Sequence, residues 1–298
     1  MSGARTLTLR AVAACVVAAP GAAWSQAAPV FSWSPATPLQ GSLVSIVVTP
    51  PDTQVFALAG ARLGNEPLHF ERGVDGVFRA LGGVGLGTRD SVILEIVVQV
   101  DTGEPQRITR WIRLARRVNR REHIRTAREF TELKSAALTA RIAGERERMG
   151  EVYRRTHETP RLWRDRFVRP VAGAVTSAFG TRRTTNGVEG ARHRGVDLDG
   201  LRGTPVQATN RGVVALAEEF YYGGRTVLID HGAGLVTGYH HLNEILVAQG
   251  DTVQPGQLIG RVGATGQVTG PHLHWLAHYG RASVDPMDLP RLEPLPAP

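Results

Sequence analysis

The chain has 298 residues, a formal net charge of +8 and a pI of about 10.6, and 42% of its residues are hydrophobic. This hydrophobic content excludes a disordered chain, and the length allows one large or two modest domains. Arginine carries nearly all of the positive charge, because Lys134 is the only lysine. We expect no nucleic-acid partner, since the sequence has no basic region with heptads, no finger spacing and no RNP-like aromatic pattern.

Residues 1–27 have the pattern of a secretory signal peptide. Arg5 and Arg10 form the positive region, and the apolar stretch that follows is too short to span a membrane. Small residues immediately upstream predict cleavage before Ala28. The alternative is a lipoprotein acylation box at Cys15, but it lies too close to Arg10 for an apolar core. Cys15 is the only cysteine, so cleavage excludes disulfides from the mature chain.

Residues 28–114 are predicted to form a β-rich N-terminal domain. Short runs of β-branched and apolar residues alternate with Gly, Pro and Asp, which is typical of strands joined by turns. Strands at this spacing favour a small sandwich. The predicted strands cover residues 43–48, 54–58, 77–81 and 92–100.

Residues 115–164 are predicted to be a charged, partly helical connector. The segment is rich in Arg and Glu, and its apolar residues Ile142, Met149, Val152 and Tyr153 fall near one helical face. We interpret it as a solvated helix between two domains. The alternative is a surface for electrostatic contacts with a partner.

Residues 165–290 are predicted to form a C-terminal antiparallel β domain, followed by a Pro-rich tail at 291–298. Gly-rich joints separate its short apolar runs, and no helical periodicity appears. The fold class predicted for the whole chain is therefore mainly β. The strands expected in this domain cover residues 212–217, 226–230, 235–239, 258–262 and 272–277.

Seven of the ten histidines fall in the predicted C-terminal domain. His193 and Asp197 form an H-x-x-x-D motif, and His272 and His274 form an H-x-H motif. Imidazoles clustered with a carboxylate are typical of a metal site. Two His and one Asp make three protein ligands, which leave a fourth position for water, as in catalytic zinc sites.

The spacing of these motifs constrains their geometry. On a strand, His272 and His274 project to one face roughly 7 Å apart, so either both bind the ion or one acts beside it. His193 and Asp197 would lie roughly 13 Å apart on a straight strand, too far to share an ion. The chain must therefore bend between them, and Gly195 permits a bend.

Further motifs surround these residues in a fixed order. They are Ser177-Ala178-Phe179-Gly180, Asn186-Gly187, Gly203-Thr204-Pro205-Val206, Tyr239-His240-His241-Leu242, Gly256-Gln257 and Thr265-Gly266. With both histidine motifs in place, the chain resembles the lysostaphin-type (LytM-like) zinc metallopeptidases over roughly residues 167–286. Members of that family cut peptide bonds in bacterial peptidoglycan.

The resemblance implies a role for each motif residue. His193, Asp197 and His274 match the zinc ligands of the family. His241 and His272 match its two catalytic histidines, and the resemblance does not say which of them is the base. The implied cofactor is Zn²⁺, and the implied fold is an antiparallel β peptidase domain preceded by an Ig-like N-terminal module.

The resulting hypothesis is a periplasmic or secreted endopeptidase that hydrolyses peptide cross-links with zinc-activated water. Its expected partners are peptidoglycan stem peptides, and we expect a monomer with no stable membrane insertion after signal cleavage. Two alternatives are an inactive regulator that activates an amidase and a lectin-like wall-binding module. The cleaved bond stays open, as does the choice between an inhibitory and a targeting N-terminal domain.

For two further residues near these motifs, the question is the orientation of one side chain and the role of the other. His240 is expected on the strand face opposite to His241, because alternate strand residues point to opposite faces. Tyr222 precedes a Gly-Gly pair and is interpreted either as a donor to the oxyanion or as a structural turn residue.

Overall fold

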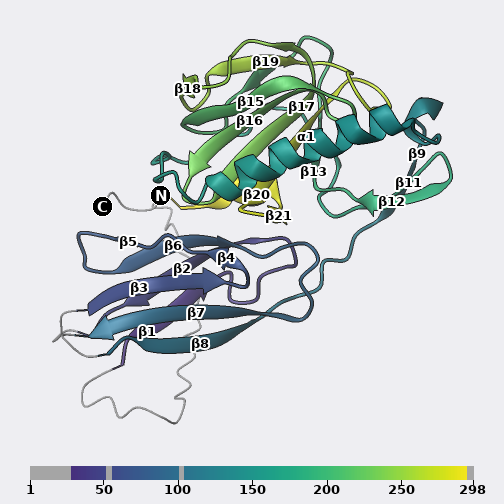
Figure 1. The fold of residues 1–298 in the computed structure, drawn as a ribbon. Coiled ribbons are helices and arrows are strands. Elements are labelled where there is room, and N and C mark those ends of the chain that lie inside the picture. The colour runs from purple at the N-terminus through teal and green to yellow at the C-terminus, as the bar shows by residue number, and fades with distance from the viewer. Residues whose placement is uncertain (1–27, 52–55, 101–103, 294–298) are drawn as a thin grey trace, which may run out of the picture.

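The computed structural model describes residues 28–51, 56–100 and 104–293 (Figure 1). The predicted signal peptide, and all but the first residues of the predicted tail, lie outside these ranges. The described chain is mostly β, as predicted, and the long strands pair antiparallel. None of its helices is long and apolar enough to cross a membrane.

The N-terminal part consists of two four-stranded sheets, drawn in purple and blue in Figure 1. They face each other closely, since a Cβ on Gly82 of one sheet would meet Leu63 of the other at 3.0 Å. The strands predicted at 43–48, 77–81 and 92–100 are present, and the Ig-like character of the pair stays a prediction. The first sheet has the order β1 (Val30–Ser34), β2 (Leu43–Thr49), β6 (Phe78–Gly83), β5 (Glu71–Arg72), and the second β4 (Glu66–Pro67), β3 (Phe56–Leu63), β7 (Ser91–Val100), β8 (Gln106–Arg113).

Strand β8 was not predicted, and its arginines explain why. Ile108, Arg110 and Ile112 all point inward in this strand. Arg110 therefore interrupts the apolar alternation that Ile108 and Ile112 would otherwise show. In the fold its guanidinium carbon lies 5.3 Å from the centre of the Phe31 ring, where the cation is attracted by the ring face. An inward arginine of this kind is invisible to a hydrophobic pattern.

The C-terminal part is built on one ten-stranded sheet in which all pairings are antiparallel, as predicted. The five strands expected from the sequence are all present, and several extend further than predicted. The main path has the order β10 (Val175–Ser177), β13 (Gly195–Asp199), β20 (His272–Tyr279), β17 (Leu235–Ile245), β16 (Gly224–Gly232), β15 (Gly212–Phe220), β18 (Thr252–Val253), with β14 (Pro205–Gln207), β19 (Leu258–Val262) and β21 (Ala282–Val284) beside it.

The connector contains the predicted helix and an unexpected strand. Helix α1 (Ala136–Arg155) is capped at its N-terminus by Ser135, whose hydroxyl accepts a hydrogen bond from the Leu138 N–H at 3.2 Å. In Figure 1 it crosses one face of the C-terminal sheet, where Met149, Val152 and Tyr153 pack on a buried cluster, as their periodicity predicts. A short 3-10 helix, η1 (Arg128–Phe130), precedes it, and β9 (Arg121–Ile124) pairs in parallel with β11 (Arg182–Thr185), which pairs antiparallel with β12 (Val188–Arg192).

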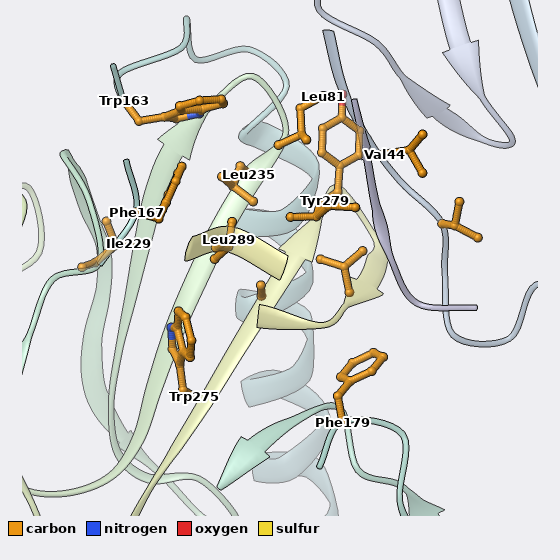
Figure 2. Packing of buried hydrophobic residues seen from close by; sticks show 14 of the residues in the cluster. Val44, Leu81, Trp163, Phe167, Phe179, Ile229, Leu235, Trp275, Tyr279 and Leu289 are labelled. Atoms are coloured by element: carbon orange, nitrogen blue, oxygen red, sulfur yellow. The ribbon is translucent and has the colours of Figure 1, made fainter. Parts of the chain in front are cut away.

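The two parts of the chain share one hydrophobic core (Figure 2). Tyr279, at the end of β20, stands next to Val44 and Leu81 of the N-terminal sheets, and its hydroxyl donates to the Pro67 carbonyl at 2.8 Å. The 3-10 helix η2 (Pro286–Arg291) lies against the same region. The N-terminal sheets are therefore packed directly on the strand that carries the H-x-H motif.

His231 joins the C-terminal sheet to the end of the connector. Its side chain is buried, Nδ1 donates to the Arg211 carbonyl at 2.7 Å, and Nε2 lies 2.8 Å from the Thr237 hydroxyl. Its backbone carbonyl accepts from the Leu162 N–H at 2.9 Å. Burial lowers the pKa of His231 from 6.5 to about 4, although hydrogen bonding to the Arg211 carbonyl and the charge of Asp230 oppose that shift.

We expect this histidine to make the metal-free protein acid-sensitive. Its folded pKa lies below the unfolded value of 6.5, so its stabilising effect is present above pH 6.5 and is lost as the pH falls toward 4. The loss is on the order of 3 kcal/mol. Urea unfolding at pH 7 and pH 4.5 measures it. His231→Asn should be less stable at pH 7 and should lose less stability on acidification. Equal losses in both proteins would contradict the assignment.

Candidate metal centre

Three side chains predicted as metal ligands converge on one point. Strands β13 and β20 are neighbours, with Asp197 directly opposite His274, and His193 lies just before β13. The Asp197 Oδ1 atom lies 3.0 Å from His193 Nε2 and 2.9 Å from His274 Nδ1. The two nitrogens are 2.9 Å apart. Among the described residues these three form the group whose donor atoms are close enough to hold a metal ion.

The predicted bend between His193 and Asp197 is present. Strand β12 ends at Arg192 and β13 begins at Gly195, so His193 lies in the short break between the two strands, and its side chain reaches Asp197. Gly195 also has a second role that the sequence did not reveal. A Cβ at this position would lie 2.8 Å from the His274 ring and 2.5 Å from a backbone oxygen, so only glycine lets the two strands approach with the imidazole between them.

The Asp197 carboxylate is buried and ionised. Burial opposes its ionisation, but the close contacts with the His193 and His274 imidazoles outweigh burial and hold its pKa well below the usual range. The two oxygens have different partners. Oδ1 faces the histidines, whereas Oδ2 accepts a hydrogen bond from the guanidinium of Arg183. Arg183 therefore leaves one oxygen directed toward the ion position.

Backbone carbonyls fix the orientation of His193. Its Nδ1 lies 3.2 Å from the Ala178 carbonyl oxygen, which only accepts, so Nδ1 carries the hydrogen. The lone pair is then on Nε2, the atom that faces Asp197 and His274. Burial lowers the pKa of His274 to about 4, against the hydrogen bond to Asp197 that raises it. A neutral imidazole is the form that binds a metal ion.

His241 and His272 lie beside this group and share a common arrangement. The His241 Nδ1 donates to the Thr265 carbonyl at 2.9 Å, and the His272 Nδ1 donates to the Gly270 carbonyl at 2.8 Å. Each ring therefore has its lone pair on Nε2. The ring centres are 5.1 Å apart, and the His272 Nε2 lies 3.6 Å from Asp197 Oδ1.

The environment keeps His241 neutral at neutral pH. Burial, followed by the neighbouring His274 and His272, lowers its pKa to about 3. Hydrogen bonding to the Thr265 carbonyl acts in the opposite direction. The side chain is thus available as a proton acceptor in a cluster that disfavours additional positive charge.

His240 does not lie on the opposite face from His241, so that expectation is wrong. His241 has a positive φ of 63°, and the pairing of β17 with β16 shifts register in the same region. This irregularity breaks the strand alternation, and both rings point to the same side. The His240 ring meets His274 edge-on at 5.4 Å, and its buried Nε2 has no hydrogen-bond partner among the described residues.

The donor set fits a transition metal such as zinc. Ligands of a tetrahedral zinc with bonds near 2.05 Å are roughly 3.3 Å apart, close to the 2.9–3.0 Å separations of the three donor atoms here. Two imidazoles and one carboxylate make three protein ligands, and His241 and His272 remain beside them.

Comparisons with known proteins agree with this geometry. The family model described as Peptidase family M23 matches residues 191–286. This range contains the three candidate ligands and both His241 and His272. Residues 191–286, about a third of the chain, are therefore similar to peptidase family M23. A crystal structure of a peptidase M23 from Pseudomonas aeruginosa is 26% identical, with a TM-score of 0.65 over 85% of this chain and 95% of that chain. That likeness extends beyond the M23 match into the connector and the N-terminal sheets.

Two curated relatives share the M23 region. The peptidoglycan DD-endopeptidase ShyA of Vibrio cholerae is 47% identical over 85 residues, 28% of this chain and 20% of that protein. The DD-carboxypeptidase/endopeptidase Mpg of Neisseria gonorrhoeae is 37% identical over 115 residues, 39% of this chain and 26% of that protein. The chain thus spans about a fifth to a quarter of the length of these relatives.

A cavity of about 310 Å³ opens beside the ligand group of the M23 domain. Asp197, His241 and His272 line it from the M23 sheet, and residues 267–271 close another side. The third wall was not foreseen from the sequence, because it comes from the connector. Glu122, Ile124 and Thr126 supply that wall, and Tyr222 packs instead against the connector residues Phe130 and Lys134.

We expect the protein to bind one zinc ion per chain. Asp197→Asn should abolish stoichiometric binding, because an uncharged amide replaces the carboxylate with almost no change of shape. His193→Ala should do the same. Metal analysis after dialysis measures the content of each protein, with the exposed connector residue His123→Ala as control. Full zinc content in Asp197→Asn and His193→Ala would remove the ligand assignment.

Proposed function

We propose that this chain is a zinc-dependent endopeptidase that hydrolyses peptide cross-links in bacterial peptidoglycan. One observation carries the proposal: in the region that matches family M23, three potential metal ligands form one group, and Asp197 of that group lines a cavity together with His241 and His272, whose Nε2 lone pairs are free. A metal held by three side chains with basic groups beside it is the arrangement of hydrolytic zinc sites.

The names of the relatives support the substrate class. ShyA is a peptidoglycan DD-endopeptidase, and Mpg is a DD-carboxypeptidase/endopeptidase. We infer by analogy that the scissile bond joins two D-configured residues of a cross-linked stem. Stem peptides carry carboxylates, and a chain with a formal charge of +8 attracts such a polymer.

His193, Asp197 and His274 would hold the zinc, which when bound acidifies water and polarises a carbonyl group. His241 and His272 handle the protons. Each has an Nδ1–H fixed by a backbone carbonyl, so each presents Nε2 to the reacting groups. One imidazole accepts the proton of the attacking water at Nε2, and the imidazolium so formed returns this proton to the leaving amine, while the other imidazole accepts a hydrogen bond from the water and orients it.

The depressed pKa of His241 keeps its Nε2 lone pair free at neutral pH. A side chain with a pKa of about 3 is unprotonated and does not repel the metal ion. No glutamate of the H-E-x-x-H type is present in the sequence, and His241 and His272 are imidazoles that lie beside the ligand group and also line the cavity.

Substitution of either histidine separates catalysis from metal binding. We expect His241→Ala and His272→Ala to retain zinc and to hydrolyse a purified cross-linked muropeptide roughly 100-fold or more slowly, as is typical after loss of an acid–base group. Mass spectrometry identifies the products, and zinc content is measured on the same samples. Loss of zinc in a variant would make that histidine a ligand.

The same digestion distinguishes an enzyme from a regulator without activity. A regulator would bind peptidoglycan and leave the muropeptide intact at every zinc concentration. The three ligand positions and both acid–base positions are filled here, which favours the enzyme.

We propose that the protein works in the cell envelope after export. The pattern of residues 1–27 and the cell-wall substrates named for the relatives support this location. Exported material should begin near Ala28, as N-terminal sequencing of an envelope fraction will show. A full-length protein confined to the cytoplasm would contradict the proposal.

A further inference from the structure

Glu122 lies outside the M23 match and reaches into its metal centre. It belongs to β9 of the connector, about 70 residues before the matched region begins at 191. In the parallel pairing of β9 with β11, Glu122 stands directly opposite Arg183. Its side chain also lines the cavity beside Asp197.

The Glu122 carboxylate binds two groups, each of which contacts a different candidate ligand. Oε2 accepts a hydrogen bond from the Ser177 hydroxyl at 2.8 Å, and the Arg183 Nε lies 3.4 Å from the same oxygen. Arg183 in turn donates to Asp197 Oδ2. The Ser177 oxygen lies 3.3 Å from His193 Nδ1.

Each contact has a consequence for the ligand. Because the Ser177 hydroxyl gives its hydrogen to Glu122, its oxygen presents a lone pair to the His193 Nδ1–H. Together with the Ala178 carbonyl, this keeps the hydrogen of the ring on Nδ1 and its lone pair on Nε2. Because Arg183 is shared with Glu122, its charge is partly compensated, and it does not act on Asp197 alone.

We propose that Glu122 is a positioning residue for the metal centre: through Ser177 and Arg183 it orients His193 and limits the pull of the guanidinium on Asp197. The connector then sets the metal affinity of the M23 domain. The proposal rests on the zinc site of the proposed function, and not on the substrate.

Strand β9 does not need the Glu122 side chain to stay in place. The Asn119 amide donates to the Phe179 carbonyl at 2.6 Å, and the Asn186 N–H donates to the Ile124 carbonyl at 3.0 Å. The Arg182 N–H donates to the Arg120 carbonyl at 3.2 Å. The Glu122 side chain is itself 29% exposed, so its ion pair with Arg183 contributes little to folding.

Two variants separate the contribution of the Glu122 charge from that of its hydrogen bond with Ser177. Glu122→Gln keeps an acceptor for the Ser177 hydroxyl but loses the charge that faces Arg183, whereas Glu122→Ala loses both. We expect the zinc dissociation constant to rise roughly 10- to 100-fold in Glu122→Ala, the usual scale for a group behind a metal ligand, and less in Glu122→Gln. Glu129→Gln, an exposed connector carboxylate, should match the wild type.

Chelator competition measures zinc affinity, and thermal unfolding of the metal-free proteins measures stability. The proposal requires weaker zinc binding with unchanged melting temperatures. Unchanged affinity in Glu122→Ala overturns it, and so does a melting temperature that falls together with affinity in both variants.

Muropeptide digestion by the wild type separates this proposal from the proposed function. If zinc affinity depends on Glu122 but the wild type leaves muropeptides intact, the peptidase proposal fails and the positioning role stands. If the wild type cleaves and Glu122 variants bind zinc normally, only the positioning role fails.

Discussion

The site depends on one buried negative charge. Asp197 lies on β13, between β10 and β20. Removing a carboxylate from water is costly unless cations or hydrogen-bond donors surround it. The Arg183 guanidinium is such a partner on one side, and the His193 and His274 imidazoles contact the carboxylate on the other. The register of β13 with β20, the absence of a side chain at Gly195 and the break between β12 and β13 at His193 all bring those partners within reach. A bound cation would complete the compensation.

Strand β20 links this site to the rest of the fold through its alternation. Its odd-numbered residues, such as Trp275 and Tyr279, are buried in the core that continues into the N-terminal sheets. Its even-numbered residues run from His272 and His274 to His278, which stacks on Tyr153 of α1 at 3.9 Å. The same face of β20 therefore presents His272 and His274 to the candidate metal centre at one end and contacts helix α1 at the other. Strand β20 is therefore packed against the core on one face and against α1 at the far end of the other.

The sequence predicted what depends on local spacing. H-x-x-x-D and H-x-H place their residues by strand and turn geometry, and the apolar runs locate most strands. His240 was misplaced because a register shift near a left-handed residue, His241, breaks the alternation on which the prediction relied. The roles of Glu122 and Arg183 were missed because the two residues are 61 positions apart and meet only through pairing of two polar strands. Polar strands of this kind have no hydrophobic period to reveal them.

The connector is therefore part of the site rather than a spacer. A boundary drawn from the family match at 191–286 excludes β9, β11 and most of β12, yet these strands form a sheet whose side chains reach the ligand group and the cavity. Because β9 continues through η1 into α1, and α1 packs on the M23 sheet, the wall of the cavity is anchored at both ends. Residues 115–120 lead from the N-terminal sheets directly into β9, so the covalent link between the two parts of the chain enters the strand whose Glu122 contacts Ser177 and Arg183.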